Sequence, residues 1–340
     1  GRGLEGGLLA TAFTMYRMQS IAALMLVSVF AVIIWRKSFF NEAEVSLSRI
    51  RLSGALLVWL IFAAVAIRGG VSDAPQSPMS AYKVGAAEQA IVAWNAPYAF
   101  LYYLAKGDKG AASLVSPKAT KEDLDIVSKM PFNHGSFTAP TKRANVIVVL
   151  LESWAADDIY SYAKKVDAAP NFDRIRKESF TTDHFYADGY RTVEGIFATF
   201  CSYPNPIGGG VAGTQLQTLR YKCLPKILSE EGWDTKFIQG SGKGIVGAFA
   251  QSLGFVDSFG KTDYSFEGTK NYWGYMDDDI YRFSLEQIKN TEPPFLISIN
   301  TGTTHDTYLP NDSEYVFGSK DRKEARRSVM HHADAALGRF

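Results

Sequence analysis

Glu152 and Thr192 are the two side chains whose types and positions could do chemistry together. Glu152 follows an apolar run, Val146–Leu151, and open α/β sheets place their chemistry just beyond the carboxyl ends of such strands. Thr192 begins a helical-looking segment that ends near Phe200, and helix N-termini favour anions. A hydroxyl there could attack an anionic group if a metal lowered its pKa. Glu152 is the candidate ligand for that metal.

The elements that must position these residues alternate between strands and helices. The run 146–151 is apolar on both faces, which is typical of a central strand of a parallel sheet buried between helices. Further strands are predicted at 235–238 and 295–299, and helices at 192–200, 224–231, 281–289 and 322–338, with another beginning near Ala169. This order predicts an α/β sandwich.

The first third of the chain is membrane-like. Residues 18–35 and 52–67 are long apolar runs, and each alone could also be a buried core helix. The basic residues of the loop 36–51 between them predict that this loop is cytoplasmic. Everything after the second run is then extracytoplasmic. Gly1 is not an initiator Met, so we expect earlier residues, and earlier spans, to be missing.

The remaining chain divides into a connecting region, 71–142, and a globular domain, 143–340. An aromatic-rich stretch, 94–103, predicts a helix that lies along the membrane or packs as an ordinary surface helix. The polar stretch 106–142 is typical of a linker. The formal net charge of +1 gives no basic face, so we expect no nucleic-acid partner.

Two cysteines, Cys201 and Cys223, are compatible with reduced core thiols or with a disulfide. An extracytoplasmic domain favours the disulfide. Cys201-Ser-Tyr-Pro204 also differs from the Cys-x-Pro-x-Arg arrangement of a formylglycine sulfatase, which argues against sulfate ester hydrolysis.

Five motifs occur in one order along the chain. They are Val148-Val-Leu-Leu-Glu152-Ser-Trp154, Arg191-Thr192-Val-Glu-Gly-Ile-Phe-Ala-Thr199, Leu224-Pro-Lys-Ile-Leu228, Phe237-Ile-Gln-Gly240 and Asn300-Thr-Gly-Thr-Thr-His305. Together they resemble the lipoteichoic acid synthase and phosphoglycerol transferase family of the alkaline phosphatase/sulfatase superfamily. The resemblance covers roughly residues 50 to 340 and leans toward the periplasmic members. It implies an alkaline-phosphatase-like sandwich preceded by transmembrane helices.

The resemblance also implies roles for individual residues. Glu152 matches the family's metal-binding glutamate, and Thr192 matches its nucleophilic, metal-coordinating threonine. His305 matches a histidine that contacts the phosphate or head group, and Gln239 stands where many members have a substrate-contacting histidine. The family completes its metal site with an Asp-His pair that this chain does not reach before Phe340. We therefore expect the 340 residues to be incomplete at the C-terminus and inactive alone.

The function that the resemblance implies is a multi-pass enzyme of the bacterial cytoplasmic (inner) membrane. It would transfer phosphoglycerol from phosphatidylglycerol to a periplasmic or cell-surface glycan, or to a glycerol polymer, using Mn²⁺ or Mg²⁺. Two alternatives stay open: a phosphoethanolamine transferase acting on lipid A, and a non-catalytic glycan-binding or sensor module.

Each site residue has a simpler interpretation. Glu152 could be a solvated carboxylate, Thr192 an N-cap, and His305 a loop histidine. The run Asp277–Asp279 is typical of a solvated turn at a helix start.

Overall fold

The computed structural model describes residues 96–106, 144–182, 185–205, 210–219, 221–310 and 312–340, with isolated residues between 54 and 81 and at 121 and 125. The chain divides into two units, Gly1–Ile67 and Arg68–Phe340. The expected span 18–35 and loop 36–51 lie outside the described residues. Six residues of the expected span 52–67 are described, and all six are helical. Within the described part of the chain, no helix combines the length and apolar character that crossing a bilayer requires.

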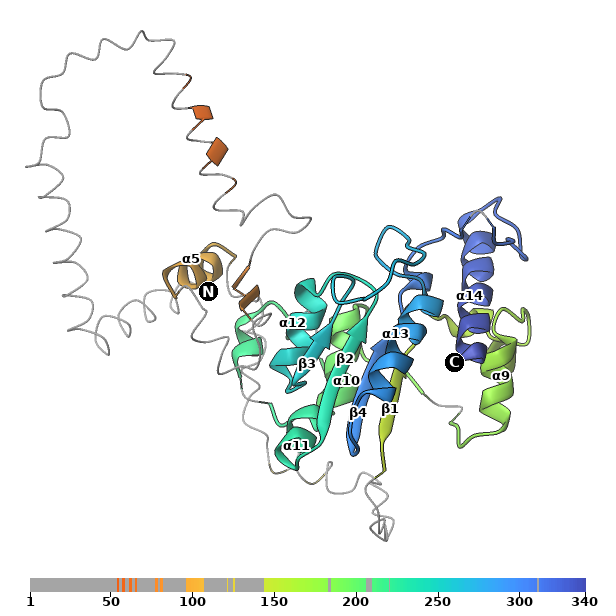
Figure 1. Ribbon diagram of the computed structural model, residues 1–340, viewed down its shortest axis with the longest axis horizontal. Coiled ribbons are helices and arrows are strands. Elements are labelled where there is room, and N and C mark those ends of the chain that lie inside the picture. Colours follow the sequence, from red (N-terminus) through yellow and green to blue (C-terminus); the bar gives the residue numbers. More distant parts are fainter. Residues whose placement is uncertain are drawn as a thin grey trace, which may run out of the picture. The chain divides into compact units, whose positions relative to one another are not determined.

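A sheet of four parallel strands forms the centre of the second unit, in the order β1-β4-β2-β3 (Figure 1). The strands are β1 (Val146–Leu150), β2 (Asp234–Gln239), β3 (Asp257–Phe259) and β4 (Phe295–Asn300). Leu150 of β1 and Gln239 of β2 both lie opposite Asn300 of β4. The carboxyl ends of these three strands therefore meet at one edge of the sheet.

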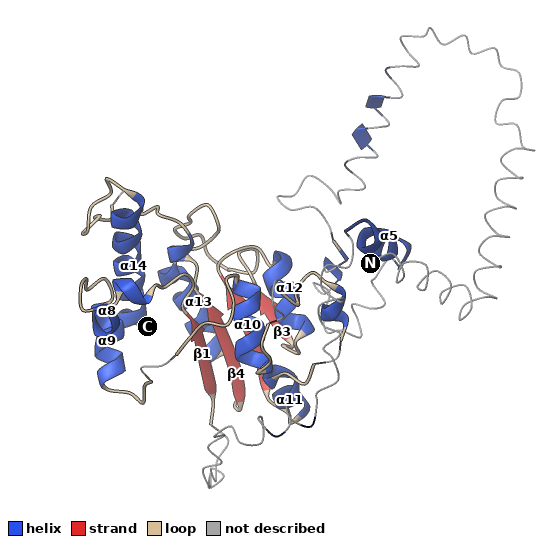
Figure 2. Cartoon of the chain, turned by 180° about the vertical axis from the view of Figure 1, so that it is seen from behind, coloured by secondary structure: helices blue, strands red, loops and turns tan. Residues whose placement is uncertain are grey.

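Helices cover both faces of the sheet (Figures 1 and 2). On one face, Phe237 of β2 packs with residues of α10 (Thr192–Cys201), α11 (Leu224–Glu230) and α12 (Gly244–Ser252). On the other, Ile238 packs with α13 (Asp277–Lys289) and α14 (Arg322–Arg339). Successive side chains of a strand point to opposite faces, so β2 contributes to both layers. The predicted α/β sandwich is confirmed.

The remaining described elements lie outside these two clusters or in the loops between the strands and helices. They are α5 (Ala96–Lys106), η2 (Ala156–Asp158), α8 (Tyr160–Ala163), α9 (Pro170–Lys177), η3 (Gln215–Thr218) and η4 (Thr303–His305). The N-terminus of α9 is attached to α14, because Asn171 N and Phe172 N each donate to the Asp334 carboxylate at 2.8 Å. The stretch that predicted a helix near 94–103 is α5.

Most predicted strands and helices coincide with observed ones, and two differences stand out. Among the described residues β1 pairs only with β4, so it lies at an edge of the sheet and not at its centre, and Ile147 is 42% exposed. The apolar pattern predicted burial on both faces but carries no information about the number of neighbouring strands. α12 and β3 were not predicted from the sequence.

The end of α10 is joined to the start of α11 by a disulfide. Cys201 is the last residue of α10, and Cys223 is the N-cap of α11. Both residues are buried in the cluster that includes Phe197 and Phe200. The bond therefore fixes the helix whose other end carries Thr192.

We expect the double substitution Cys201→Ala and Cys223→Ala to lower the free energy of unfolding by about 3 kcal/mol. The reason is that opening a loop with a sequence separation of 22 residues returns conformational entropy to the unfolded chain. Guanidinium unfolding measures the change. Wild type treated with dithiothreitol is the matched control, and it should unfold at the same denaturant concentration as the double variant. Equal free energies of unfolding for the oxidised wild type and the double variant would contradict the expectation.

Candidate active site at the carboxyl edge of the sheet

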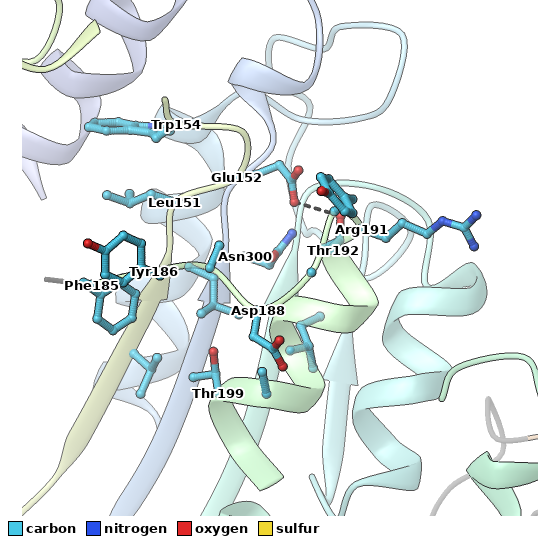
Figure 3. A pocket seen from close by; sticks show the side chains of 18 of the residues that line it. Leu151, Glu152, Trp154, Phe185, Tyr186, Asp188, Arg191, Thr192, Thr199 and Asn300 are labelled. Carbon is cyan, nitrogen blue, oxygen red and sulfur yellow. Dashed lines mark hydrogen bonds between the residues drawn. The ribbon is translucent and has the colours of Figure 1, made fainter. Parts of the chain in front are cut away.

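Glu152 and Thr192 lie in contact although 40 residues separate them. The Thr192 hydroxyl donates a hydrogen bond of 2.8 Å to Glu152 Oε2 (Figure 3). Glu152 lies just beyond β1, and Thr192 is the first residue of α10. Both side chains are half-buried. The structure thus brings together the carboxylate and the hydroxyl that the sequence singled out.

The start of α10 leaves the Thr192 side chain free to face Glu152. The N-cap residue is Arg191, whose backbone is extended, so the interpretation of Thr192 as N-cap is wrong. The Glu194 carboxylate accepts hydrogen bonds from Tyr190 N at 2.7 Å and Arg191 N at 3.2 Å. Glu194, the third residue of the helix, therefore accepts hydrogen bonds from backbone N–H groups before the helix. The Thr192 hydroxyl is not needed as a capping group.

Two threonine hydroxyls from the loop after β4 hold the Glu152 backbone. Glu152 N donates to Thr301 Oγ1 at 2.9 Å, and the Thr304 hydroxyl donates to the Glu152 carbonyl oxygen. The Ser153 hydroxyl in turn donates to Glu152 Oε1 at 2.9 Å. The Glu152 loop is thereby attached to its neighbour, and its carboxylate is oriented from both sides.

Asp277, the first residue of α13, holds that neighbouring loop in place. Asp277 Oδ1 accepts hydrogen bonds from Gly302 N at 2.8 Å and Thr303 N at 2.9 Å, while Asp277 N donates to Thr303 Oγ1 at 2.7 Å. Asp277 is only 1% exposed, and burial raises its pKa above the ordinary value although the backbone N–H groups oppose the shift. The expected solvated turn is therefore wrong for this residue.

The other two acids of that run bind elsewhere on the surface. Asp278 forms a salt bridge with Arg339 at 2.7 Å, and Asp279 accepts a hydrogen bond from Thr269 N at 2.7 Å. The three adjacent carboxylates thus have separate partners, as successive residues of a helix face different directions.

A cavity of about 990 Å³ opens beside Glu152 and Thr192. Its aromatic lining residues are Trp154, Phe172, Phe185, Tyr186, Tyr190 and Tyr203. Figure 3 shows Trp154, Phe185 and Tyr186 among them. Its charged lining residues are Glu152, Asp188 and Arg191. The cavity can therefore accept a substrate with a bulky apolar part next to the Thr192 hydroxyl.

Neither Gln239 nor His305 is among the residues that line this cavity. Gln239 is 1% exposed, and its amide nitrogen donates to the Gly242 carbonyl oxygen at 2.7 Å. His305 is exposed and its ring lies 4.2 Å from the ring of Trp273, centroid to centroid. The structure thus places Gln239 inside its own loop and His305 on the surface next to the Glu152 loop.

Glu152 and Thr192 fit part of a site for a hard divalent ion. Their side-chain oxygens are adjacent, and oxygen is the ligand atom that Mg²⁺ and Mn²⁺ prefer. Such an ion requires more than two ligands. In the part of the chain that the structure describes, no group of three or more His, Cys, Asp or Glu side chains could hold it.

Three residues that position Glu152 were not identified from the sequence. Thr301 and Thr304 belong to the polar run after the predicted strand 295–299, so their place at the sheet edge was foreseeable. Asp277 lies 25 residues away from the loop that it binds, and nothing local in the sequence indicates that contact.

The fold resembles that of solved proteins of the alkaline phosphatase superfamily. A member from Vibrio parahaemolyticus is 25% identical, with a TM-score of 0.53, over 58% of this chain and 50% of that one. Lipoteichoic acid synthase LtaP from Listeria monocytogenes is 17% identical, with a TM-score of 0.51, over 58% of this chain and 51% of that one. The second likeness shows the fold alone.

The family model described as Sulfatase matches residues 144–340, which is more than half of the chain. The chain therefore belongs to the sulfatase family. The lipoteichoic acid synthase-like protein YvgJ of Bacillus subtilis is 22% identical over 247 residues, which are 66% of this chain and 39% of YvgJ. The chain thus spans about two fifths of that relative's length.

Replacing Asp277 tests the attachment of the loop. We expect Asp277→Ala to lower the free energy of unfolding by about 2–4 kcal/mol, because two backbone N–H groups lose their acceptor. Asp277→Asn keeps an acceptor oxygen and should stay near wild type at acidic pH, where the Asp277 carboxyl is also neutral. Denaturant unfolding of the two variants measures both effects. Equal losses of unfolding free energy in the two variants would show that the acceptor oxygen of residue 277 does not account for the loss.

The difference in the free energy of unfolding between wild type and Asp277→Asn should depend on pH. Because the folded-state pKa of Asp277 lies above the ordinary 3.8, its contribution to stability is fully present below that value and is lost as pH rises through the folded pKa. Wild type should therefore lose stability relative to Asp277→Asn as the pH rises from about 4 toward neutrality. A constant difference across that range would contradict the raised pKa.

Proposed function

We propose that this protein is a membrane-anchored phosphoglycerol transferase. It moves phosphoglycerol from phosphatidylglycerol to a hydroxyl of a glycan or of a glycerol polymer, outside the cytoplasmic membrane. The observation that carries the proposal is the hydrogen bond between Thr192 and Glu152 at the N-terminus of α10. The membership in the sulfatase family and the likeness to YvgJ support it.

Thr192 has the geometry of a nucleophile. Its hydroxyl lies 2.8 Å from Glu152 Oε2 at the first residue of α10, so the oxygen is placed to attack phosphorus as its proton passes to solvent. The bond between phosphorus and the diacylglycerol oxygen then breaks, and diacylglycerol leaves after taking a proton from solvent. In a second step an acceptor hydroxyl loses its proton to solvent and attacks phosphorus. The bond between phosphorus and the Thr192 oxygen breaks, and that oxygen takes up a proton from solvent, which restores the threonine.

The charges around Thr192 support a requirement for a cation. Glu152 and Asp188 are acidic lining residues of the cavity, and Arg191 is its basic one. In Figure 3 the Arg191 side chain points away from Glu152. A phosphodiester anion approaching Thr192 would therefore be repelled by the adjacent carboxylate. A divalent ion held by Glu152 and Thr192, Mn²⁺ or Mg²⁺ in this proposal, would neutralise that charge and lower the pKa of the hydroxyl.

The disulfide argues against a sulfate ester hydrolase that uses formylglycine. Cys201 is bonded to Cys223, so its sulfur is not available for conversion to an aldehyde. It also lies at the opposite end of α10 from Thr192. The hydroxyl that lines the cavity in contact with Glu152 belongs to a threonine, which favours transfer through a glycerophosphothreonine.

A membrane anchor suits a lipid donor. The apolar runs 18–35 and 52–67 would place the domain 143–340 beside the bilayer, with 71–142 as the connection. The aromatic lining of the cavity is compatible with the diacylglycerol end of such a donor.

The nucleophile is tested in the full-length protein reconstituted with labelled phosphatidylglycerol. We expect Thr192→Ala to reduce diacylglycerol release by more than about a thousandfold, because no other group replaces the attacking oxygen. Thr192→Ser keeps a hydroxyl and should retain measurable turnover, and mass spectrometry should detect the glycerophosphoryl ester of the serine side chain. Undiminished release by Thr192→Ala would rule this nucleophile out. Release from phosphatidylethanolamine instead would favour a phosphoethanolamine transferase.

The proposed cation is tested by binding as well as by turnover. We expect EDTA to abolish diacylglycerol release and added Mn²⁺ or Mg²⁺ to restore it. Glu152→Gln keeps the shape of the side chain but loses its charge, so Mn²⁺ binding followed by electron paramagnetic resonance should weaken by tenfold or more. Glu178→Gln, a change in an exposed carboxylate of the α9 C-cap, is the matched control. Equal Mn²⁺ affinity in both variants would remove Glu152 from the metal site.

A further inference from the structure

A tight turn before α13 displays two aromatic side chains next to the candidate active site. Asn271 Oδ1 accepts hydrogen bonds from Trp273 N at 2.9 Å and Gly274 N at 3.0 Å, and Asn271 N donates to the Gly274 carbonyl oxygen at 2.8 Å. Lys270 and Tyr275 form an isolated bridge that closes the turn. The backbone of the turn is thus fixed by its own amide side chain.

The turn is also attached to the carboxyl edge of the sheet. Tyr275 N donates to the Gly240 carbonyl oxygen at 3.0 Å, just beyond β2, and Asn271 Nδ2 donates to the Gly302 carbonyl oxygen at 3.3 Å, beyond β4. Gly274 lies so close to Gly240 that a Cβ would stand 2.1 Å from the Gly240 oxygen. Only glycine fits at position 274, so this residue allows the turn to pack closely against Gly240.

The turn carries two aromatic side chains that are exposed to solvent. Tyr272 is 86% exposed and Trp273 is 46% exposed, and their rings meet edge to face at 5.5 Å. The His305 ring lies 4.2 Å from the Trp273 ring with an interplanar angle of 31°. Large aromatic side chains that a rigid backbone holds in solvent are typical of binding surfaces, because little entropy is lost when a ligand packs on them.

This aromatic pair lies close to the residues that hold Glu152. Thr304, which donates to the Glu152 carbonyl oxygen, directly precedes His305. Gly302, which accepts from Asn271, is held by Asp277. One hydrogen-bonded assembly therefore supports both Glu152 and the aromatic turn, and fixes the distance between them.

We propose that Tyr272 and Trp273, backed by His305, form the subsite that binds the acceptor as a neutral sugar ring. This rests on the proposed function and selects the glycan over the glycerol polymer. A pyranose has a face of C–H groups that packs on an aromatic ring, whereas open-chain glycerol has none. The turn 271–275 contains no acidic or basic side chain, and the neighbouring Lys270 is paired with Glu267 at 2.7 Å. An ionic ligand would find no counter-charge on this turn.

Binding is measured on the full-length protein in detergent with a panel of neutral gluco-, galacto- and manno-oligosaccharides, using calorimetry. We expect at least one member to bind, and Tyr272→Ala and Trp273→Ala each to weaken its affinity by about tenfold. Tyr160→Ala is the matched control, because Tyr160 is a 49% exposed tyrosine of α8 and should leave the affinity unchanged. Absence of binding by every sugar, or equal affinity in all variants, would overturn the subsite.

A second readout separates this proposal from the proposed function. In Trp273→Ala, the KM for the bound oligosaccharide as acceptor should rise about tenfold with little change in kcat, whereas Tyr160→Ala should leave both values unchanged. The KM for glycerol as acceptor should stay constant. Equal rises for sugar and glycerol would overturn the subsite. Failure of wild type to release diacylglycerol would refute the phosphoglycerol reaction, and the calorimetric result would still decide whether the turn binds sugars.

Discussion

The hydrogen bonds between the Glu152 loop and the loop after β4 are the constraint on which the candidate site depends. Glu152 is attached at its N–H by Thr301 and at its carbonyl by Thr304. This is possible because Leu150 and Asn300 are paired in the sheet, so the two strands end level. The carboxylate then lies next to the first turn of α10, where Thr192 donates to it. Without the parallel register, the hydroxyl and the carboxylate would have no reason to coincide.

The sequence indicates this pairing because both partners are marked by local patterns. The apolar run that ends in Glu152 predicts a carboxylate at the sheet edge. Gly189, followed three residues later by the hydroxyl of Thr192, predicts a helix start. The patterns fail where local signals are weak. α12 begins at Gly244 and contains Gly247, whose missing side chain allows Ser258 of β3 to come close; a Cβ there would lie 2.8 Å from Ser258 Oγ. Glycine lowers helix propensity, so the packing that requires it also hides the helix.

Asp277 shows a second reason why sequence patterns do not predict every contact of the site. Three adjacent aspartates at a helix start have a sufficient local explanation in the helix dipole. The structure adds a long-range one for Asp277 alone, since its carboxylate binds the backbone of Gly302 and Thr303. A buried carboxylate is costly unless it is hydrogen-bonded, and its Oδ2 has no partner among the described residues. The cost of burying the Asp277 carboxylate is compatible with a role in positioning the loop after β4. Its Oδ1 atom is the acceptor for the two backbone N–H groups of Gly302 and Thr303.

The two sides of the candidate site differ in a way that suits a transfer reaction. Four aromatic residues that line the cavity beside Thr192 belong to the chain around α10, and Trp154 and Phe172 complete its aromatic lining, whereas Tyr272 and Trp273 belong to the turn before α13. The residues around α10 belong to the segment that carries the nucleophile, and the turn belongs to the assembly that carries Glu152. A ping-pong transferase must accept a donor and later an acceptor at one phosphorus. Separate supports for the two groups allow each substrate to be recognised without disturbing the contact between Thr192 and Glu152.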